Sequence, residues 1–217
     1  MDQPIPDRVC FLVDGFNLYH SICQAAKELN GASVKWMDLP ALFQNHLYLM
    51  GTRARIVRII YFTAYAHHLH EKNPGKVSRH KAYTRTLTAN KVEVRESHFK
   101  RKEAFDLKMG TSFVTYEEKE TDVAIASVLI EGGVLDQFDT AVLVTGDTDL
   151  KPAVITFQRL YPQKRVLFAF PFARKNRELA NLAPGSFSFS AESYAANPFS
   201  PQVRLPSGKF VSKPTEW

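Results

Sequence analysis

Apolar runs and amphipathic stretches alternate along most of this chain. Runs typical of buried strands cover residues 8–14, 55–65, 140–145 and 166–170, and residues 91–95 alternate as a strand with one wet side does. Patterns that favour helices cover residues 17–29, 38–50, 78–89, 121–130, 150–160 and 174–182. Strands that alternate with helices need crossover connections. We therefore expect a three-layer α/β/α domain with a mostly parallel central sheet of about five strands.

Two features of composition suggest boundaries. Gly132 and Gly133 are expected to end the helix that begins near Thr121. From residue 191 onward, proline, serine and glycine become frequent, which is typical of an extended segment. The sequence thus predicts one domain over residues 1–190 and a Pro/Ser-rich C-terminal tail over residues 191–217.

Carboxylates stand where α/β domains keep their sites. Asp14 ends the first expected strand, Asp147 and Asp149 follow the fourth, and Asp122 opens the helix before it. Ligands of open parallel sheets bind beyond the carboxyl ends of strands, where the strand order reverses. We expect Asp14, Asp122 and Asp147 to converge within reach of one metal ion. All-oxygen ligands favour Mg²⁺ or Mn²⁺, and no Cys/His set has zinc-ligand spacing.

Each carboxylate also has a simpler explanation. Asp14 and Asp149 are residue types that cap helices, and Asp122 is a charge that a helix N-terminus favours. Glu118 and Glu120 are expected to be solvated. Two rival enzyme classes do not fit. A haloacid-dehalogenase-type phosphatase needs an aspartate where Phe16 stands, and a dinucleotide fingerprint needs three glycines where the chain has Gly15 alone.

Positive charge is concentrated in one segment. Residues 64–108 hold eleven Lys and Arg against five Asp and Glu, whereas the rest of the chain is neutral. Such a segment attracts polyanions, or is a solvated basic face without a partner. Lys100, Arg101 and Lys102 are its densest run and candidate backbone contacts for a nucleic acid. The interleaved Tyr83, Phe99 and Phe105 either stack on unpaired bases or belong to the core.

The cysteines, the apolar runs and the N-terminal residues bear on the cellular setting of the protein. Its two cysteines, Cys10 and Cys23, cannot form a disulfide framework, and no run of about 20 apolar residues could span a bilayer. The N-terminus does not have the pattern of a secretory signal. We expect a cytoplasmic protein with no membrane association.

Three short motifs resemble those of the NYN domains, nuclease-like relatives of PIN domains. Residues 13–17 (VDGFN) resemble the family's DGxN opening, residues 119–124 (KETDVA) its K-x-x-D-V helix start, and residues 145–152 (TGDTDLKP) its [ST]-G-D-x-D-[FL]-x-P segment. The motifs occur in the family's order, and the likeness extends over residues 8–189. Glu120 departs from it, since the family usually has a small residue there.

The resemblance implies a PIN-like, Rossmann-like fold and a Mg²⁺- or Mn²⁺-dependent ribonuclease acting on single-stranded RNA. Its acidic set is Asp14, Asp122, Asp147 and Asp149 in this chain. Asn17 would be a polar companion of the metal, Thr145 a hydroxyl at the strand end, and Lys119 a phosphate contact or a surface lysine. The alternative is a non-catalytic RNA-binding or regulatory module of the same fold, because fold does not imply function.

Overall fold

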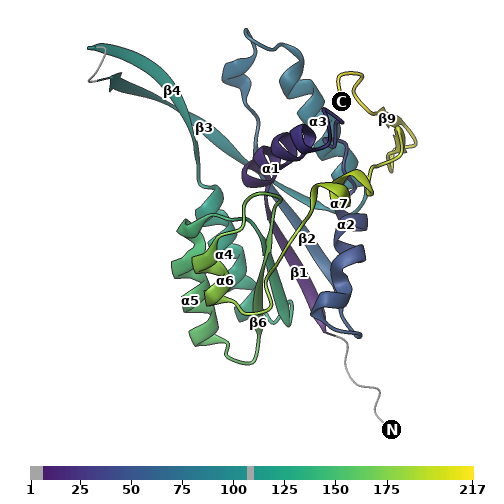
Figure 1. Cartoon of the computed structure of the whole chain (residues 1–217), viewed down its shortest axis with the longest axis vertical. Coiled ribbons are helices and arrows are strands. Elements are labelled where there is room, and N and C mark those ends of the chain that lie inside the picture. Colours follow the sequence, from purple (N-terminus) through teal and green to yellow (C-terminus); the bar gives the residue numbers. More distant parts are fainter. Residues whose placement is uncertain (1–6, 107–109) are drawn as a thin grey trace.

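A single curled sheet runs through the centre of the protein in the computed structural model, which describes residues 7–106 and 110–217 (Figure 1). Its strands lie in the order β4-β3-β2-β1-β5-β6-β7, and all neighbours are parallel except β3 and β4. The strands are β1 (Arg8–Asp14), β2 (Arg55–Ala64), β3 (Glu93–Asp106), β4 (Thr111–Lys119), β5 (Thr140–Val144), β6 (Arg165–Phe170) and β7 (Phe187–Ser188). The expected mostly parallel sheet is confirmed, but it has seven strands and not about five.

Helices cover both faces of the sheet (Figure 1). One face carries α1 (Gly15–Glu28), α2 (Leu39–His46), α3 (Gly75–Ala89) and α7 (Ala191–Ala195), and the other α4 (Thr121–Val134), α5 (Lys151–Leu160) and α6 (Arg177–Leu182). Short 3-10 turns are η1 (Leu47–Met50), η2 (His67–Leu69) and η3 (Thr148–Leu150). Two hydrophobic cores result, the first between the sheet and α1, α2, α3 and α7, and the second between the sheet and α4, α5 and α6. In β1, Phe11 packs into the first core and Leu12 into the second, so the strand is buried on both sides as expected.

Helix α4 continues through Gly132 and Gly133, which corrects the expected stop. A Cβ atom on Gly132 would lie 2.2 Å from a ring carbon of Phe138, and one on Gly133 would lie 2.8 Å from a ring carbon of Phe157. These glycines therefore let aromatic rings approach the helix backbone and do not end the helix.

Strands β3 and β4 form a ribbon that projects from the body of the protein (Figure 1). Only residues 93–97 of β3 pair with β2, whereas residues 98–106 pair with β4 alone. The strand expected over residues 91–95 covers only the first part of β3, and β4 was not expected. In the projecting ribbon both strands are rich in charged residues. They lack the buried apolar face whose alternating pattern predicts a strand from sequence.

Residues after 195 fold against the α3 side of the protein and form the hairpin of β8 (Gln202–Arg204) and β9 (Phe210–Ser212). The indole Nε1 of Trp36 donates a hydrogen bond to the carbonyl oxygen of Ser200 at 2.9 Å. Arg79 of α3 pairs with Glu216 at 2.8 Å, and the ring of Trp217 lies 6.3 Å from that of Trp36. The segment expected as a tail thus covers part of the first core. Within residues 7–106 and 110–217, no helix is both long and apolar enough to cross a membrane.

Candidate metal centre

The acidic residues meet where the strand order reverses. The chain moves from β1 to β2 and β3 on one side, and returns to place β5 and β6 on the other side of β1. Asp14 is the last residue of β1, and Thr145 directly follows β5, which is paired with β1. Asp14 is only 5% exposed. This is the crevice in which open α/β sheets bind ligands, and Asp14 and Asp147 were expected there.

Hydrogen bonds join the ends of β1 and β5 into one unit. The hydroxyl of Thr145 donates to Asp14 Oδ2 at 2.9 Å and accepts from the backbone N–H of Asp147 at 3.1 Å. Asn17 donates its backbone N–H to Asp14 Oδ1 at 2.9 Å, and its side-chain oxygen accepts from the N–H of Gly146 at 3.2 Å. Asp14 is thus both an α1 cap and a member of the cluster, while Asn17 and Thr145 hold the surrounding loops in place.

The carboxylates influence one another strongly. Burial raises the pKa of Asp14 above its usual value, and the charge of Asp147 raises it further. Burial, then the charges of Asp14, Asp147 and Asp149, raise the pKa of Asp122 to about 6. The helix cap considered for Asp149 is wrong: Asp147 caps η3 by accepting the backbone N–H of Asp149 at Oδ1 (3.0 Å), and no side chain caps α5. All four residues therefore belong to one electrostatic cluster.

Glu118 is a fifth member, and the expectation that it is solvated was wrong. It is partly buried, accepts a hydrogen bond from the hydroxyl of Thr121 at 2.7 Å, and has a raised pKa caused by burial and by Asp14 and Asp122. Its position depends on β4 returning to the sheet edge, so no local pattern could reveal it. Glu120 is exposed and lies beside His98.

The donor set suits a hard divalent cation, because it consists of carboxylate oxygens whose charges repel one another. The expected convergence of Asp14, Asp122 and Asp147 on one ion is not found. Within the described residues, no three Asp, Glu, His or Cys side chains lie close enough to hold an ion between them. Both oxygens of Asp14 and one of Asp147 instead accept internal hydrogen bonds. Mg²⁺ commonly keeps several waters and uses one or two carboxylates, so these residues fit a hydrated cation.

The basic candidates lie on the ribbon and not at the cluster. Residues that face each other across an antiparallel pair point to the same side, and successive residues point to opposite sides. Lys100, Lys102 and Lys119 therefore share one face, and Arg101 lies on the other. Lys102 and Lys119 both form ion pairs with Glu117, at 2.5 and 2.9 Å. Lys108, at the end of the basic segment, lies outside the described residues.

The three aromatic candidates have different environments. Tyr83 is buried in the first core, and its hydroxyl donates to the carbonyl oxygen of Met37 at 2.9 Å. Phe105 is 58% exposed near the tip of the ribbon. Phe99 lies at the base of the ribbon, in the wall of a pocket beside the acidic cluster. Phe99 and Phe105 therefore present more ring surface to a ligand than Tyr83, which reaches the same pocket from the core.

Comparison with known proteins decides the family. Residues 8–191 match the family model of the NYN domain, a region that contains all three acidic motifs. The chain belongs to the NYN domain family. NYN domains are generally nucleases that act on RNA and typically use divalent metals. This NYN domain contains the acidic residues that the resemblance implied.

Two individual proteins are similar to this NYN domain. The 6-hydroxy-3-succinoylpyridine 3-monooxygenase HspA of Pseudomonas putida is 27% identical, over 79% of this chain and 62% of the relative. The chain thus spans less than two thirds of that protein's length, and the activity in its name stays a property of the relative. A crystal structure of a Vibrio parahaemolyticus protein of unknown function has a TM-score of 0.57 and 18% identity, covering 88% of this chain and 97% of that one. This second likeness concerns the fold alone.

Proposed function

We propose that this NYN domain is a metal-dependent ribonuclease that hydrolyses phosphodiester bonds of single-stranded RNA. The observation that carries the proposal is the set of four aspartates at the strand-order reversal, where burial and mutual repulsion raise the pKa of Asp122 to about 6. Repulsion of this kind is relieved by a divalent cation. Mg²⁺ or Mn²⁺ is the cation that an all-oxygen set favours.

Asp14 and Asp147 would be the direct ligands, with Asp122 and Asp149 holding further waters or a second ion. A bound divalent cation supplies an activated water and neutralises charge on the phosphate. Asp14 suits its role because Thr145 and the N–H of Asn17 restrain its carboxylate. The carboxylate of Asp122 has a pKa near 6 and is suited to accept a proton from the attacking water at neutral pH.

The ribbon would bind the RNA backbone. Its basic face carries Lys100, Lys102 and Lys119, and contacts of this kind attract phosphates without recognising base sequence. Lys100 forms no ion pair among the described residues, whereas Lys102 and Lys119 share Glu117. A single strand suits this site because a splayed strand can bring one phosphate into the crevice.

The test is cleavage of end-labelled single-stranded RNA by the purified chain with Mn²⁺, with Mg²⁺ and with EDTA. We expect cleavage with metal and none in EDTA. Asp147→Asn should lower the rate by at least about a hundredfold, the usual scale for losing a transition-state contact. Asp136→Asn is the matched control, because Asp136 is an exposed partner of Arg8 and Lys164.

Two results would refute the nuclease. One is RNA that stays intact under every metal condition, and the other is equal cleavage by the Asp147→Asn variant and the wild type. Binding of the RNA without cleavage would establish the alternative, an RNA-binding module of the same fold.

A further inference from the structure

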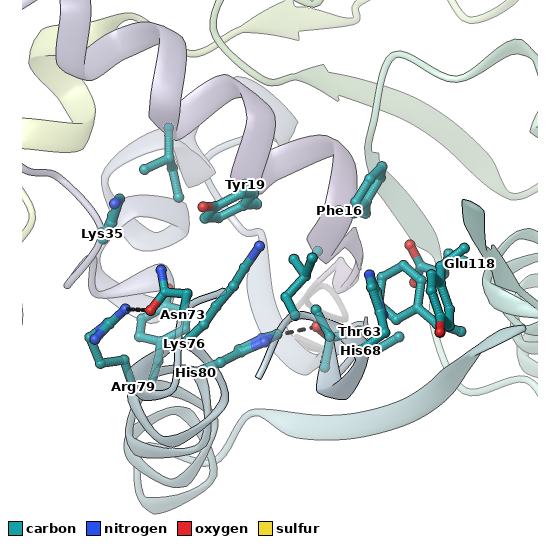
Figure 2. A pocket seen from close by; sticks show the side chains of 18 of the residues that line it. Phe16, Tyr19, Lys35, Thr63, His68, Asn73, Lys76, Arg79, His80 and Glu118 are labelled. Carbon is teal, nitrogen blue, oxygen red and sulfur yellow. Dashed lines mark hydrogen bonds between the residues drawn. The ribbon is translucent and has the colours of Figure 1, made fainter. Parts of the chain in front are cut away.

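A pocket of about 360 Å³ adjoins the acidic cluster but has a different chemistry. It lies between α1, α3, the segment around η2 and the base of the ribbon (Figure 2). Gly15, Phe16 and Glu118 form its border with the cluster. Its volume is at the lower end of the range for small-molecule sites and would hold about one ring system with a short substituent.

One end of the pocket is built from aromatic rings. His68 stacks on Tyr116 with ring centroids 4.1 Å apart and planes 9° from parallel, and Phe99 meets His68 edge-on at 4.8 Å. Phe16 projects from α1 at the same end and is 47% exposed (Figure 2). The Nδ1 atom of His68 is buried without a hydrogen-bond partner among the described residues. Exposed flat rings beside such a stack are surfaces on which another flat ring packs well.

The other end carries positive charge that the protein leaves uncompensated. Arg79 is already bound to Asn73 at 2.7 Å and to Glu216 at 2.8 Å. Lys76 forms no ion pair within residues 7–106 and 110–217, and its ammonium lies 5.9 Å from the centroid of the Tyr19 ring. Figure 2 shows Lys76 extending into the pocket from α3. A partly buried cation without a carboxylate partner is a ready site for an anionic group.

His80 adds no positive charge to this end. Its Nε2 is 3.1 Å from the hydroxyl of Thr63, and burial followed by the charge of Lys76 lowers its pKa to about 4, so it is neutral at physiological pH. The cations of the pocket wall are Lys35, Lys76 and Arg79, of which Arg79 is paired with Glu216 and Lys76 extends into the pocket (Figure 2). The pocket thus offers aromatic surface at one end and a lysine ammonium at the other.

We propose that this pocket binds a ligand with one flat aromatic ring and one anionic group, the ring against Phe16 and Tyr116 and the anion at Lys76. Two sources have this chemistry, a nucleotide with its base and phosphate, and a free aromatic carboxylic acid. The proposal goes beyond the ribonuclease proposal, because binding here needs neither the metal nor cleavage. If the ligand is a nucleotide, the pocket would be a subsite of the proposed RNA crevice, because it adjoins the acidic cluster.

The experiment is calorimetric titration of the full chain in EDTA at low salt. Adenosine 5′-monophosphate and 4-hydroxybenzoate are the complete probes. Adenosine and inorganic phosphate are the two halves of the first, and phenol and acetate are those of the second. We expect at least one complete probe to bind, and its halves to bind at least about tenfold more weakly, since each contact is worth roughly one decade. The complete probe that binds more tightly identifies the source.

Substitutions test the placement. Lys76→Ala and Tyr116→Ala should each weaken binding of the complete probe by about tenfold. The matched controls are Lys72→Ala, an exposed lysine of the same loop region, and Phe113→Ala, an exposed ring on the opposite face of the ribbon. Both should bind like the wild type, and thermal melting should confirm that all four variants fold.

The proposal is overturned if neither complete probe binds, if the halves bind as tightly as the whole, or if the pocket variants bind as well as their controls. Failure of the nuclease proposal is separate. Asp147→Asn should lose cleavage while keeping full affinity for the probe, because Asp147 is not part of the pocket wall.

Discussion

Asp122→Asn should stabilise the metal-free protein, because the ionised carboxylate of Asp122 is partly buried beside other negative charges. The pKa of Asp122 is raised from 3.8 to about 6, mainly by burial and then by Asp14, Asp147 and Asp149. A shift of about two units corresponds to about 3 kcal/mol of penalty for the ionised form. Since Asp122 is only partly buried, solvent screening reduces this to about 1.5 kcal/mol. For a chain of this size, the variant should gain about 3–6 °C in Tm.

The sign depends on pH in a defined way. Between pH 3.8 and 6 the folded state binds more protons at Asp122 than the unfolded state does, so stability falls as pH rises through this window. The gain from Asp122→Asn should therefore be complete at pH 7.5 and absent near pH 4. Thermal melting in EDTA and low salt at these two pH values measures it. Excess Mg²⁺ should stabilise the wild type more than the variant.

A matched control, Asp136→Asn, should change the stability in the opposite direction. Ion pairs with Lys164 and Arg8 lower the pKa of Asp136, so Asp136→Asn should slightly destabilise the protein at pH 7.5. The reasoning about the cluster is refuted if Asp122→Asn gives no gain at pH 7.5 in EDTA, or if its gain is equally large at pH 4.

Three further predictions concern stability. Gly132→Ala should cost about 1–3 kcal/mol in urea unfolding, because the new Cβ would lie 2.2 Å from the Phe138 ring, and adding Phe138→Leu should recover part of the loss. Burial lowers the pKa of His80 from 6.5 in the unfolded chain to about 4 in the folded protein. The free energy of unfolding should therefore fall by at most about 3 kcal/mol as the pH falls from 6.5 to 4, and His80→Gln should reduce this fall. Thr145→Val should cost about 1–3 kcal/mol because it removes the hydroxyl that donates to buried Asp14, and unchanged stability would contradict the role given to that bond.

The buried parallel strands were predictable because their signal is local. The expected strand over residues 8–14 matches β1, and the expected strands over residues 140–145 and 166–170 differ from β5 and β6 by one residue at one end. Such strands are apolar on both faces, so sequence alone distinguishes them from their surroundings. Helix boundaries moved further: α6 begins three residues later than expected, where Asn176 caps its first turn, and α4 ends four residues later.

The ribbon was not predictable from such a signal. Residues 98–106 and 111–119 are largely polar or exposed, and cross-strand pairing defines their structure. Everything that depends on the ribbon was also missed, including the burial of Glu118 and the stack of Tyr116 on His68. The basic run of residues 100–102 divides between two faces, with Arg101 opposite Lys100 and Lys102, because successive residues of a strand point in opposite directions.

The carboxylate cluster also combines features that local sequence predicts with features that depend on contacts between distant segments. Motif spacing and strand periodicity are local, so they were enough to place Asp14, Asp147 and Asp149 at strand ends and Asp122 at the start of a helix. The pairing of β1 with β5, the hydrogen bond from Thr145 to Asp14 and the fifth carboxylate, Glu118, follow only from the folded structure. The pocket beside them also depends on the tertiary structure, since its walls come from segments between Gly15 and Trp217. Burial and electrostatic coupling arise between segments far apart in the chain, so no local pattern contains them.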